Sequence, residues 1–217
     1  FVMAALFVVG ISAWYLLKKR DIRFAKNSML VGATFGLISS IFLIVSGDEA
    51  AHQIAHKQPV KLAAMEGLYE GEYEAGLVTV GLLNSDKTLT NDEEAFHFEL
   101  KIPYVLSVLG YHELHAYVPG LKDLVYGNKE QHIMSVEEKM QKGKIAVASL
   151  EAYKEAKKVK DANKAKEAKV LLEKNMPYFG YGYIKSAEDV VPPVALTFYA
   201  FHIMVYLGGW FMALFAL

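Results

Sequence analysis

The stretch QPVKLAAMEG, residues 58–67, places a carboxylate and a cation in one short apolar segment. Lys61 and Glu66 are five residues apart, which on a regular helix is about 500° of rotation and leaves the side chains roughly 140° apart. They therefore do not form the ion pair of residues spaced i, i+4. They could flank one ligand if the helix is bent or begins late, and Pro59 favours a helix that begins there. A buried carboxylate can act as a proton acceptor while a lysine balances charge, but the same residues also fit an ordinary charged helix.

A second pair, His202 and Met204, lies about ten residues inside an apolar run that extends from residue 194 to residue 217. A titratable group at such a depth is costly unless it faces a cavity or a partner, which makes His202 a functional candidate. Methionine in an apolar helix is usually a packing residue. Met204 becomes a candidate metal ligand only through its neighbours.

Two histidines at i and i+4, His52 and His56, imitate a helical zinc site. The metalloprotease motif needs Glu directly after the first histidine, where this chain has Gln53. Glu49 and His52 imitate the E-x-x-H of di-iron bundles, which needs matching carboxylates on other helices. These residues are interpreted as a wet helix at a membrane interface.

Two further motifs also lack part of their pattern. The segment from His112 to His115 is one residue short of the zinc spacing and is interpreted as a polar loop. The sequence FGYGY at 179–183 lacks the Thr-Val that precedes Gly-Tyr-Gly in a potassium filter. It is interpreted as a glycine-aromatic turn that leads to the last apolar run.

The chain that must position these residues has the composition of a membrane protein. Of its 217 residues 53% are hydrophobic, none is cysteine, and the net charge is −1. Residues 28–46 carry no charge, and 194–217 is a second run long enough to cross a bilayer core of roughly 30 Å. Residues 1–17 form a shorter run without the basic leader of a signal peptide. Because both ends of the chain lie in apolar stretches, we expect an excerpt of a larger polytopic protein.

The expected fold is all-α, a polytopic transmembrane helix bundle with a long, partly helical extracytoplasmic loop. The connector 18–27 holds five basic residues and one acid, which predicts that it is cytoplasmic. The predicted division is therefore a truncated transmembrane helix at 1–17, a cytoplasmic connector at 18–27, a transmembrane helix at 28–46, an extracytoplasmic region at 47–191 and a transmembrane helix at 192–217.

Two parts of the outer region have their own patterns. Ser135 and Glu138 form a capping box that predicts the start of a long helix, whose Ala- and Lys-rich middle projects into water. Residues 67–95 carry Gly, Asn, Asp and Thr around short apolar runs, which predicts a mobile loop. Loops of that length are usually functional lids or disordered.

Five separated segments resemble, in order, the central part of subunit I of the cytochrome bd quinol oxidases. They are GISAWYLLKKRDIRFAKNS, GDE, QPVKLAAMEG, IPYVLS and PPVALTFYAFHIMV. The resemblance covers nearly the whole chain and is weakest in the acidic loop and the lysine-rich helix. It implies that 47–191 contains the quinol-binding loop, and that the quinol-binding residues of the family fall on Gln58, Lys61 and Glu66.

Further implications of the resemblance concern the haem groups. The family's methionine ligand of the low-spin haem b falls on Met204, and the ligands of the high-spin haem b and of haem d lie in other parts of the family chain. Such a ligand opposite histidine would raise the haem potential relative to two histidines. His202 stands where the family commonly has Arg, which would keep its charge at any pH, whereas histidine has a reference pKa of about 6.5.

The function that the resemblance implies is that of a quinol:oxygen oxidoreductase in a bacterial or archaeal cytoplasmic membrane. Glu66 would accept a proton from the quinol hydroxyl and Lys61 would hold the other oxygen or balance charge, with protons released outside. Implied partners are quinol, oxygen, subunit II, small accessory subunits and lipid, and no nucleic acid is expected. Two alternatives are a non-catalytic membrane receptor with an outer partner-binding domain, and an ion channel; the long segment between the spans and the missing Thr-Val disfavour the channel.

Overall fold

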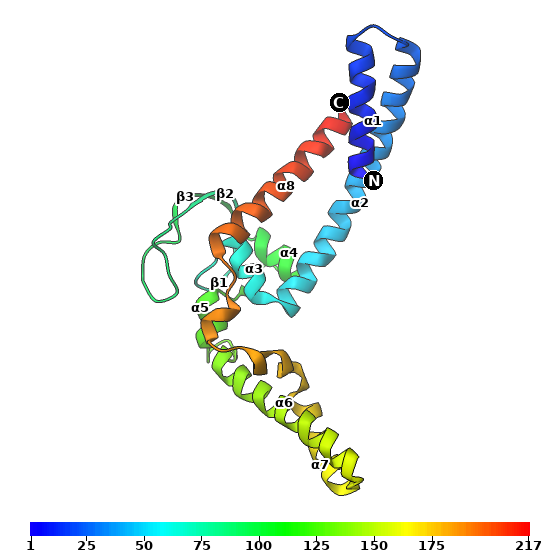
Figure 1. Cartoon of the computed structure of the whole chain (residues 1–217). Coiled ribbons are helices and arrows are strands. Elements are labelled where there is room, and N and C mark those ends of the chain that lie inside the picture. Colours follow the sequence, from blue (N-terminus) through cyan, green and yellow to red (C-terminus); the bar gives the residue numbers. More distant parts are fainter.

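A computed structural model describes all residues from Phe1 to Leu217. Helix α1 (Val2–Leu17) and helix α2 (Ile22–Lys57) form an antiparallel pair at one end of the molecule (Figure 1). The last helix, α8 (Val194–Ala216), returns to α2, so that the C-terminus lies beside the α1–α2 pair. Many large apolar side chains on these three helices are exposed, as is expected of surfaces that face lipid or other protein.

Two helical stretches are long and apolar enough to cross a membrane, by length and composition only: Ile22–Lys57, and Ala187–Ala216, which contains α8. Helix α1 is apolar but shorter. The predicted span at 28–46 lies inside α2, which continues as one helix to Lys57.

The middle of the molecule is built from short elements. Helix α3 (Pro59–Glu66) follows α2 after a break at Gln58, and α4 (Val105–Tyr111) and α5 (Leu121–Tyr126) pack nearby. Strands β1 (Glu72–Tyr73) and β4 (Tyr117–Val118) pair antiparallel, as do β2 (Leu77–Leu83) and β3 (Phe96–Ile102). Most of the chain is helical as predicted, but the all-α prediction is wrong for these two small sheets.

The prediction of a mobile loop over residues 67–95 is wrong for β2, and the β2–β3 turn is internally bonded. Asn84 donates from Nδ2 to Glu94 O, and Asn91 donates from Nδ2 to Asp86 O. The apolar and polar residues of β3 alternate in sequence, which is the period of a strand. The alternation in FHFELKI is the sequence signal for a strand, and the polar residues of the preceding turn obscured it.

The far end of the molecule is a helical hairpin, with α6 (Val136–Val159) packed on α7 (Ala162–Asn175) (Figure 1). The predicted cap is confirmed, because Ser135 Oγ accepts a hydrogen bond from Glu138 N at 3.2 Å. The single long helix is not found: Lys160 has a φ of 58°, and Asp161 caps α7 by accepting from Lys164 N. A left-handed residue and a new N-cap therefore reverse a chain whose helix propensity is high on both sides.

Two 3₁₀ segments, η1 (Met176–Tyr183) and η2 (Ala187–Val190), connect α7 to α8. The FGYGY motif lies in η1, which packs along α6. A Cβ on Gly143 of α6 would come within 2.3 Å of Gly182 N, so the two backbones touch. The motif thus serves close helix packing, as the interpretation of a glycine-aromatic turn expects.

The buried core lies between α2, α3 and the short elements. One cluster joins α2, α3 and α4 through Ala55, Leu62 and Leu106, with Ala75 between β1 and β2 and Val118 of β4. A second cluster joins α3 to α5 through Val60, Ala63, Ala64, Leu121 and Leu124. Helix α3 is the element common to both, so its side chains are held from several directions.

Candidate functional site

Helix α3 is short because both of its ends are fixed by sequence. Gln58 has φ −137° and ψ 55°, which interrupts the helical path from α2, and Pro59 occupies the first turn where its missing N–H is harmless. Gly67, at φ 65°, ends the helix in the left-handed region that glycine adopts most easily. The QPVKLAAMEG segment therefore forms a separate helix at a bend, and this helix begins at Pro59, as the sequence indicated.

Lys61 and Glu66 lie in different environments on this helix. Every residue from Val60 to Glu66 is buried except Lys61, which is exposed. Gln58 is exposed as well, and Lys61 N donates to Gln58 O at 2.9 Å. The helix thus presents a polar first turn to solvent and a carboxyl group to the interior, and the predicted separation of the two charges agrees with this placement.

Glu66 is the most perturbed acid of the chain. Glu66 is only 3% exposed, and its Oε2 has no hydrogen-bond partner. Burial raises the pKa of Glu66 from an ordinary 4.5 to about 8, while the positive charge of Lys101 acts in the opposite direction. A buried carboxyl with a free oxygen and a pKa near neutrality is suited to accept and release a proton.

The cation that acts on Glu66 was missed from sequence. Lys101 lies on β3 opposite Val78 of β2, and its Nζ is 2.5 Å from Glu72 Oε1. The aliphatic part of Lys101 lies against the backbone at Gly76, where an added Cβ would approach its Cγ to 2.6 Å. The position of Lys101 depends on the β2–β3 pairing. The sequence signal that could have identified it is the polar–apolar alternation of β3, which ends where the IPYVLS segment begins.

The β2–β3 hairpin covers the end of α3. A Cβ on Gly67 would approach Phe96 Cζ to 2.7 Å and Leu83 Cδ2 to 3.1 Å. The ring of Phe96 also packs on Phe198 of α8, with centroids 5.4 Å apart. Glu66 is consequently enclosed by α3 itself, the hairpin and the beginning of α8.

One face of α8 is bonded to the backbone of β2. His202 is 7% exposed, and its Nε2 lies 2.7 Å from Val78 O while its Nδ1 lies 2.9 Å from Phe198 O. Tyr199 Oη accepts from Leu83 N at 3.0 Å, and Tyr206 Oη donates to Thr79 O. The polar group expected to need a partner inside the apolar run therefore finds it in a strand that is distant in sequence.

Met204 lies on another face of the same helix. Two residues correspond to about 200° of rotation, and Met204 is 60% exposed whereas His202 is buried. The thioether is thus accessible from outside this chain, and the hairpin does not cover it. An accessible thioether on an apolar helix fits the axial ligand of a haem held against this surface.

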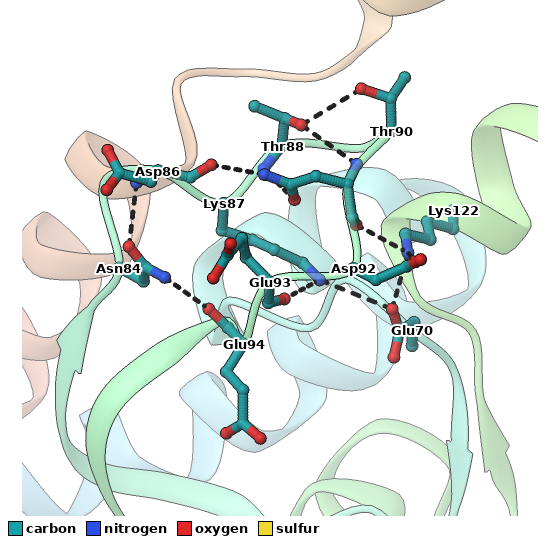
Figure 2. A network of polar contacts seen from close by, with 11 residues as sticks. Glu70, Asn84, Asp86, Lys87, Thr88, Thr90, Asp92, Glu93, Glu94 and Lys122 are labelled. Atoms are coloured by element: carbon teal, nitrogen blue, oxygen red, sulfur yellow. Dashed lines mark hydrogen bonds and ion pairs between the residues drawn. The ribbon is translucent and has the colours of Figure 1, made fainter.

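Near α3, two lysines converge on one acid (Figure 2). Lys122 Nζ is 2.7 Å from Glu70 Oε1 and 3.2 Å from Asn91 O, and Lys87 Nζ is 3.6 Å from the same Glu70 oxygen. Lys87 is nearly buried and also donates to Glu93 O. The hydrogen bond from Lys122 lowers the pKa of Glu70. These contacts fix the tip of the hairpin to α5 and to the segment that follows α3.

The histidine motifs do not form a metal centre. His52 and His56 share a face of α2 near its C-terminal end, and His115 pairs with Glu74 at 2.6 Å. No group of three or more His, Asp or Glu side chains has the geometry to hold a metal ion.

Comparison with known proteins extends over the whole chain. The profile of the family described as cytochrome bd terminal oxidase subunit I matches residues 1–217. Cytochrome bd-II ubiquinol oxidase subunit 1 of Escherichia coli is 31% identical over 96% of this chain and 40% of its own length. Cytochrome bd ubiquinol oxidase subunit 1 of Bacillus subtilis is 34% identical over 55% of this chain and 25% of its own length.

A second Bacillus subtilis protein, a putative cytochrome bd menaquinol oxidase subunit I, is 30% identical over 56% of this chain and 27% of its own length. The chain therefore spans two fifths or less of the curated relatives it matches. The solved structure of bd oxidase from Geobacillus thermodenitrificans shares the fold, with a TM-score of 0.50 and 19% identity over 99% of this chain and 54% of that one. Because the family profile covers the full chain, the protein belongs to the cytochrome bd terminal oxidase subunit I family.

Proposed function

We propose that this chain is the quinol-oxidising part of a cytochrome bd-type oxidase, with α3 at the substrate site. The observation that carries the proposal is Glu66, a carboxyl buried in the family's K-L-A-A-x-E segment, with an unpaired oxygen and a pKa near neutrality. Oxidising a quinol releases two protons as well as two electrons, so the site needs a proton acceptor at the hydroxyl group. The relatives are named for ubiquinol and for menaquinol, and quinol is the substrate class proposed.

The proposed proton chemistry at Glu66 involves two lysines, Lys101 and Lys61. In its ionised form Glu66 Oε2 accepts the hydroxyl proton, and the field of Lys101 stabilises the carboxylate that must exist before each transfer. Gln58 and Lys61 lie one turn apart at the exposed start of α3, where they would bind the other quinol oxygen.

Electron entry would use the opposite side of α8. Met204 would ligate the iron of the low-spin haem b through its thioether, and its accessibility on the helix surface supports that role. The bound haem supplies a one-electron acceptor for quinol. His202 orients this part of α8 through its bond to Val78 O. The high-spin haem b, haem d and the reduction of oxygen would belong to the remainder of the subunit and to its partner subunit II, with possible small accessory subunits.

The proposed topology places the proton acceptor outside the cytoplasm. The basic connector at 18–27 would lie on the cytoplasmic side, α2 and α8 would cross the bilayer, and 47–191 would face outward. Protons from quinol would then leave on the outer side. If oxygen reduction takes its protons from the cytoplasm, charge is separated without a pump.

The test is Glu66→Ala in the parent protein, assayed in membranes for quinol-dependent oxygen uptake and for haem content by reduced-minus-oxidised spectra. We expect turnover to fall at least 100-fold, as is usual when a general base is removed, with haem content retained. Glu99→Ala, at an exposed position of β3, is the matched control and should keep normal turnover. Normal turnover in Glu66→Ala would remove this carboxyl from the mechanism.

A further inference from the structure

Three histidine rings gather where the C-terminal end of α2 meets the end of α4. The ring of His52 stacks on that of His112, with centroids 4.4 Å apart and an interplanar angle of 7°. The ring of His56 also lies near that of His52, with centroids 4.4 Å apart and an interplanar angle of 50°. We call His52, His56 and His112 the histidine clasp, because they join two helices that are distant in sequence.

The hydrogen bonds of the clasp fit neutral rings. His52 Nδ1 lies 3.0 Å from Gly110 O, and His56 Nδ1 lies 3.0 Å from His52 O. A carbonyl oxygen only accepts hydrogen bonds, so both Nδ1 atoms carry the proton and both Nε2 atoms need none. In this state the stack holds no net charge, and stacked uncharged rings attract one another.

One carboxylate contacts the clasp. Asp48 Oδ2 lies 3.6 Å from His112 Nε2, and this contact becomes an ion pair when His112 is protonated. On α2, Glu49 is bonded to Gln53 and Lys57 adds a positive charge next to His56. Three further residues surround the clasp: Tyr111 contacts His56, Glu113 follows His112, and α3 contributes the apolar Leu62 to the core beneath.

Acidification replaces the attraction between neutral rings with repulsion between charged rings. A first proton on His112 is balanced by Asp48, but a second on His52 places two like charges in rings 4.4 Å apart, and no other carboxylate pairs with a ring nitrogen of the clasp. Separated helices do not suffer this repulsion, so the contact weakens when the rings become charged. His52 is partly exposed, and His56 and His112 are exposed, so protons can reach the rings.

We propose that the histidine clasp is a pH-sensitive contact that holds α4 on α2 when its rings are neutral and releases α4 when they become charged. Release would extend beyond the helix, because Ser107 of α4 accepts from Ala75 N and donates to Ala116 O. Leu106 also shares a core cluster with Leu62 of α3. This inference does not depend on quinol oxidation, since it concerns only the docking of two helices.

The experiment measures amide hydrogen exchange over Val105–Tyr111 in the intact parent protein at about pH 7.5 and about pH 5.5, a range that includes the titration of free imidazole. The matched variant is His56→Phe/His112→Phe, which keeps aromatic rings on both sides of His52 but leaves one titratable group. Comparing wild type with this variant at the same pH cancels the intrinsic pH dependence of exchange. We expect wild type to lose about tenfold more protection on acidification than the variant.

Two further variants make the result specific. His115→Phe alters a histidine outside the clasp and should keep the wild-type response. Asp48→Asn removes the one balancing charge without changing shape, and should move the loss of protection to higher pH. An equal response in wild type and in His56→Phe/His112→Phe would overturn the proposal, as would a response in Asp48→Asn that is unchanged or moves to lower pH.

Discussion

Glu66→Gln tests whether the buried carboxyl sets the pH dependence of quinol oxidation. With a pKa of about 8, Glu66 is about one tenth ionised at pH 7 and about one hundredth at pH 6. If the ionised form is the proton acceptor, as proposed, the rate should rise about tenfold between pH 6 and 7 and level off above about pH 9. Glutamine has nearly the same shape and cannot accept the proton, so the variant should be slow at every pH.

The assay is the initial rate of quinol-dependent haem reduction, followed by stopped-flow absorption in membranes of the parent protein. Haem content is measured on the same samples, so that a loss of haem is not mistaken for a loss of proton transfer. A wild-type rate that stays constant between about pH 6 and about pH 8 would refute the role of Glu66, and so would a variant with the wild-type pH profile.

Glu66→Gln should also raise the free energy of unfolding at neutral and alkaline pH, because the pKa of Glu66 is raised in the folded protein. Burial favours the neutral acid, so folding at pH 7 requires a proton that the unfolded chain lacks, at a cost on the order of 3 kcal/mol. This cost is absent near pH 4.5, grows as pH rises and is complete above about 8. Glu66→Gln should therefore unfold at a higher temperature than wild type near pH 8, with little difference near pH 4.5.

Three further changes test the surroundings of the site. Lys101→Met removes a positive charge that lowers the pKa of Glu66, so the midpoint of the rate profile should move to higher pH; a downward shift would contradict this. Met204→Leu should abolish the low-spin haem absorption while other haem signals survive, and an unchanged spectrum would exclude the ligand role. Gly67→Ala should cost about 1–2 kcal/mol in thermal unfolding, since its φ is 65° and its Cβ would meet Phe96, whereas Gly10→Ala, with open space, should cost nothing.

The parts of the fold that sequence could predict are those set by local composition. The apolar runs locate α2 and α8, Pro59 locates the start of α3, and Ser135 with Glu138 locates the start of α6. Each of these depends on neighbouring residues alone, either through hydropathy or through a cap. The reversal at Lys160 was not visible, because a residue with ordinary helix propensity there adopts a left-handed conformation.

The sequence identified the main residues of the candidate site but not their surroundings. Glu66 was singled out by its segment, yet its burial depends on Phe96 and Leu83 of a hairpin whose strands are joined by a polar turn. Lys101 depends on the same pairing. Lys87 shows the same limit, since a single lysine in an acidic segment reads as solvated but is nearly buried beside Glu70 and the ring of Tyr69. Contacts of this kind arise only after strands have paired.

If Glu66 accepts protons and Met204 holds a haem, as proposed, the arrangement of α8 explains how the two sites can be close together and still differ in environment. Tyr199, His202 and Tyr206 are spaced by three and four residues, so they share the face that binds β2 and closes the cover over Glu66. Met204 lies about 200° from His202 on the exposed side. A carboxyl needs a dry site for its pKa to approach neutrality, whereas an axial ligand needs free space for a large flat group. One helix meets both needs, because its hairpin-facing side excludes water from the acid while the other side stays open.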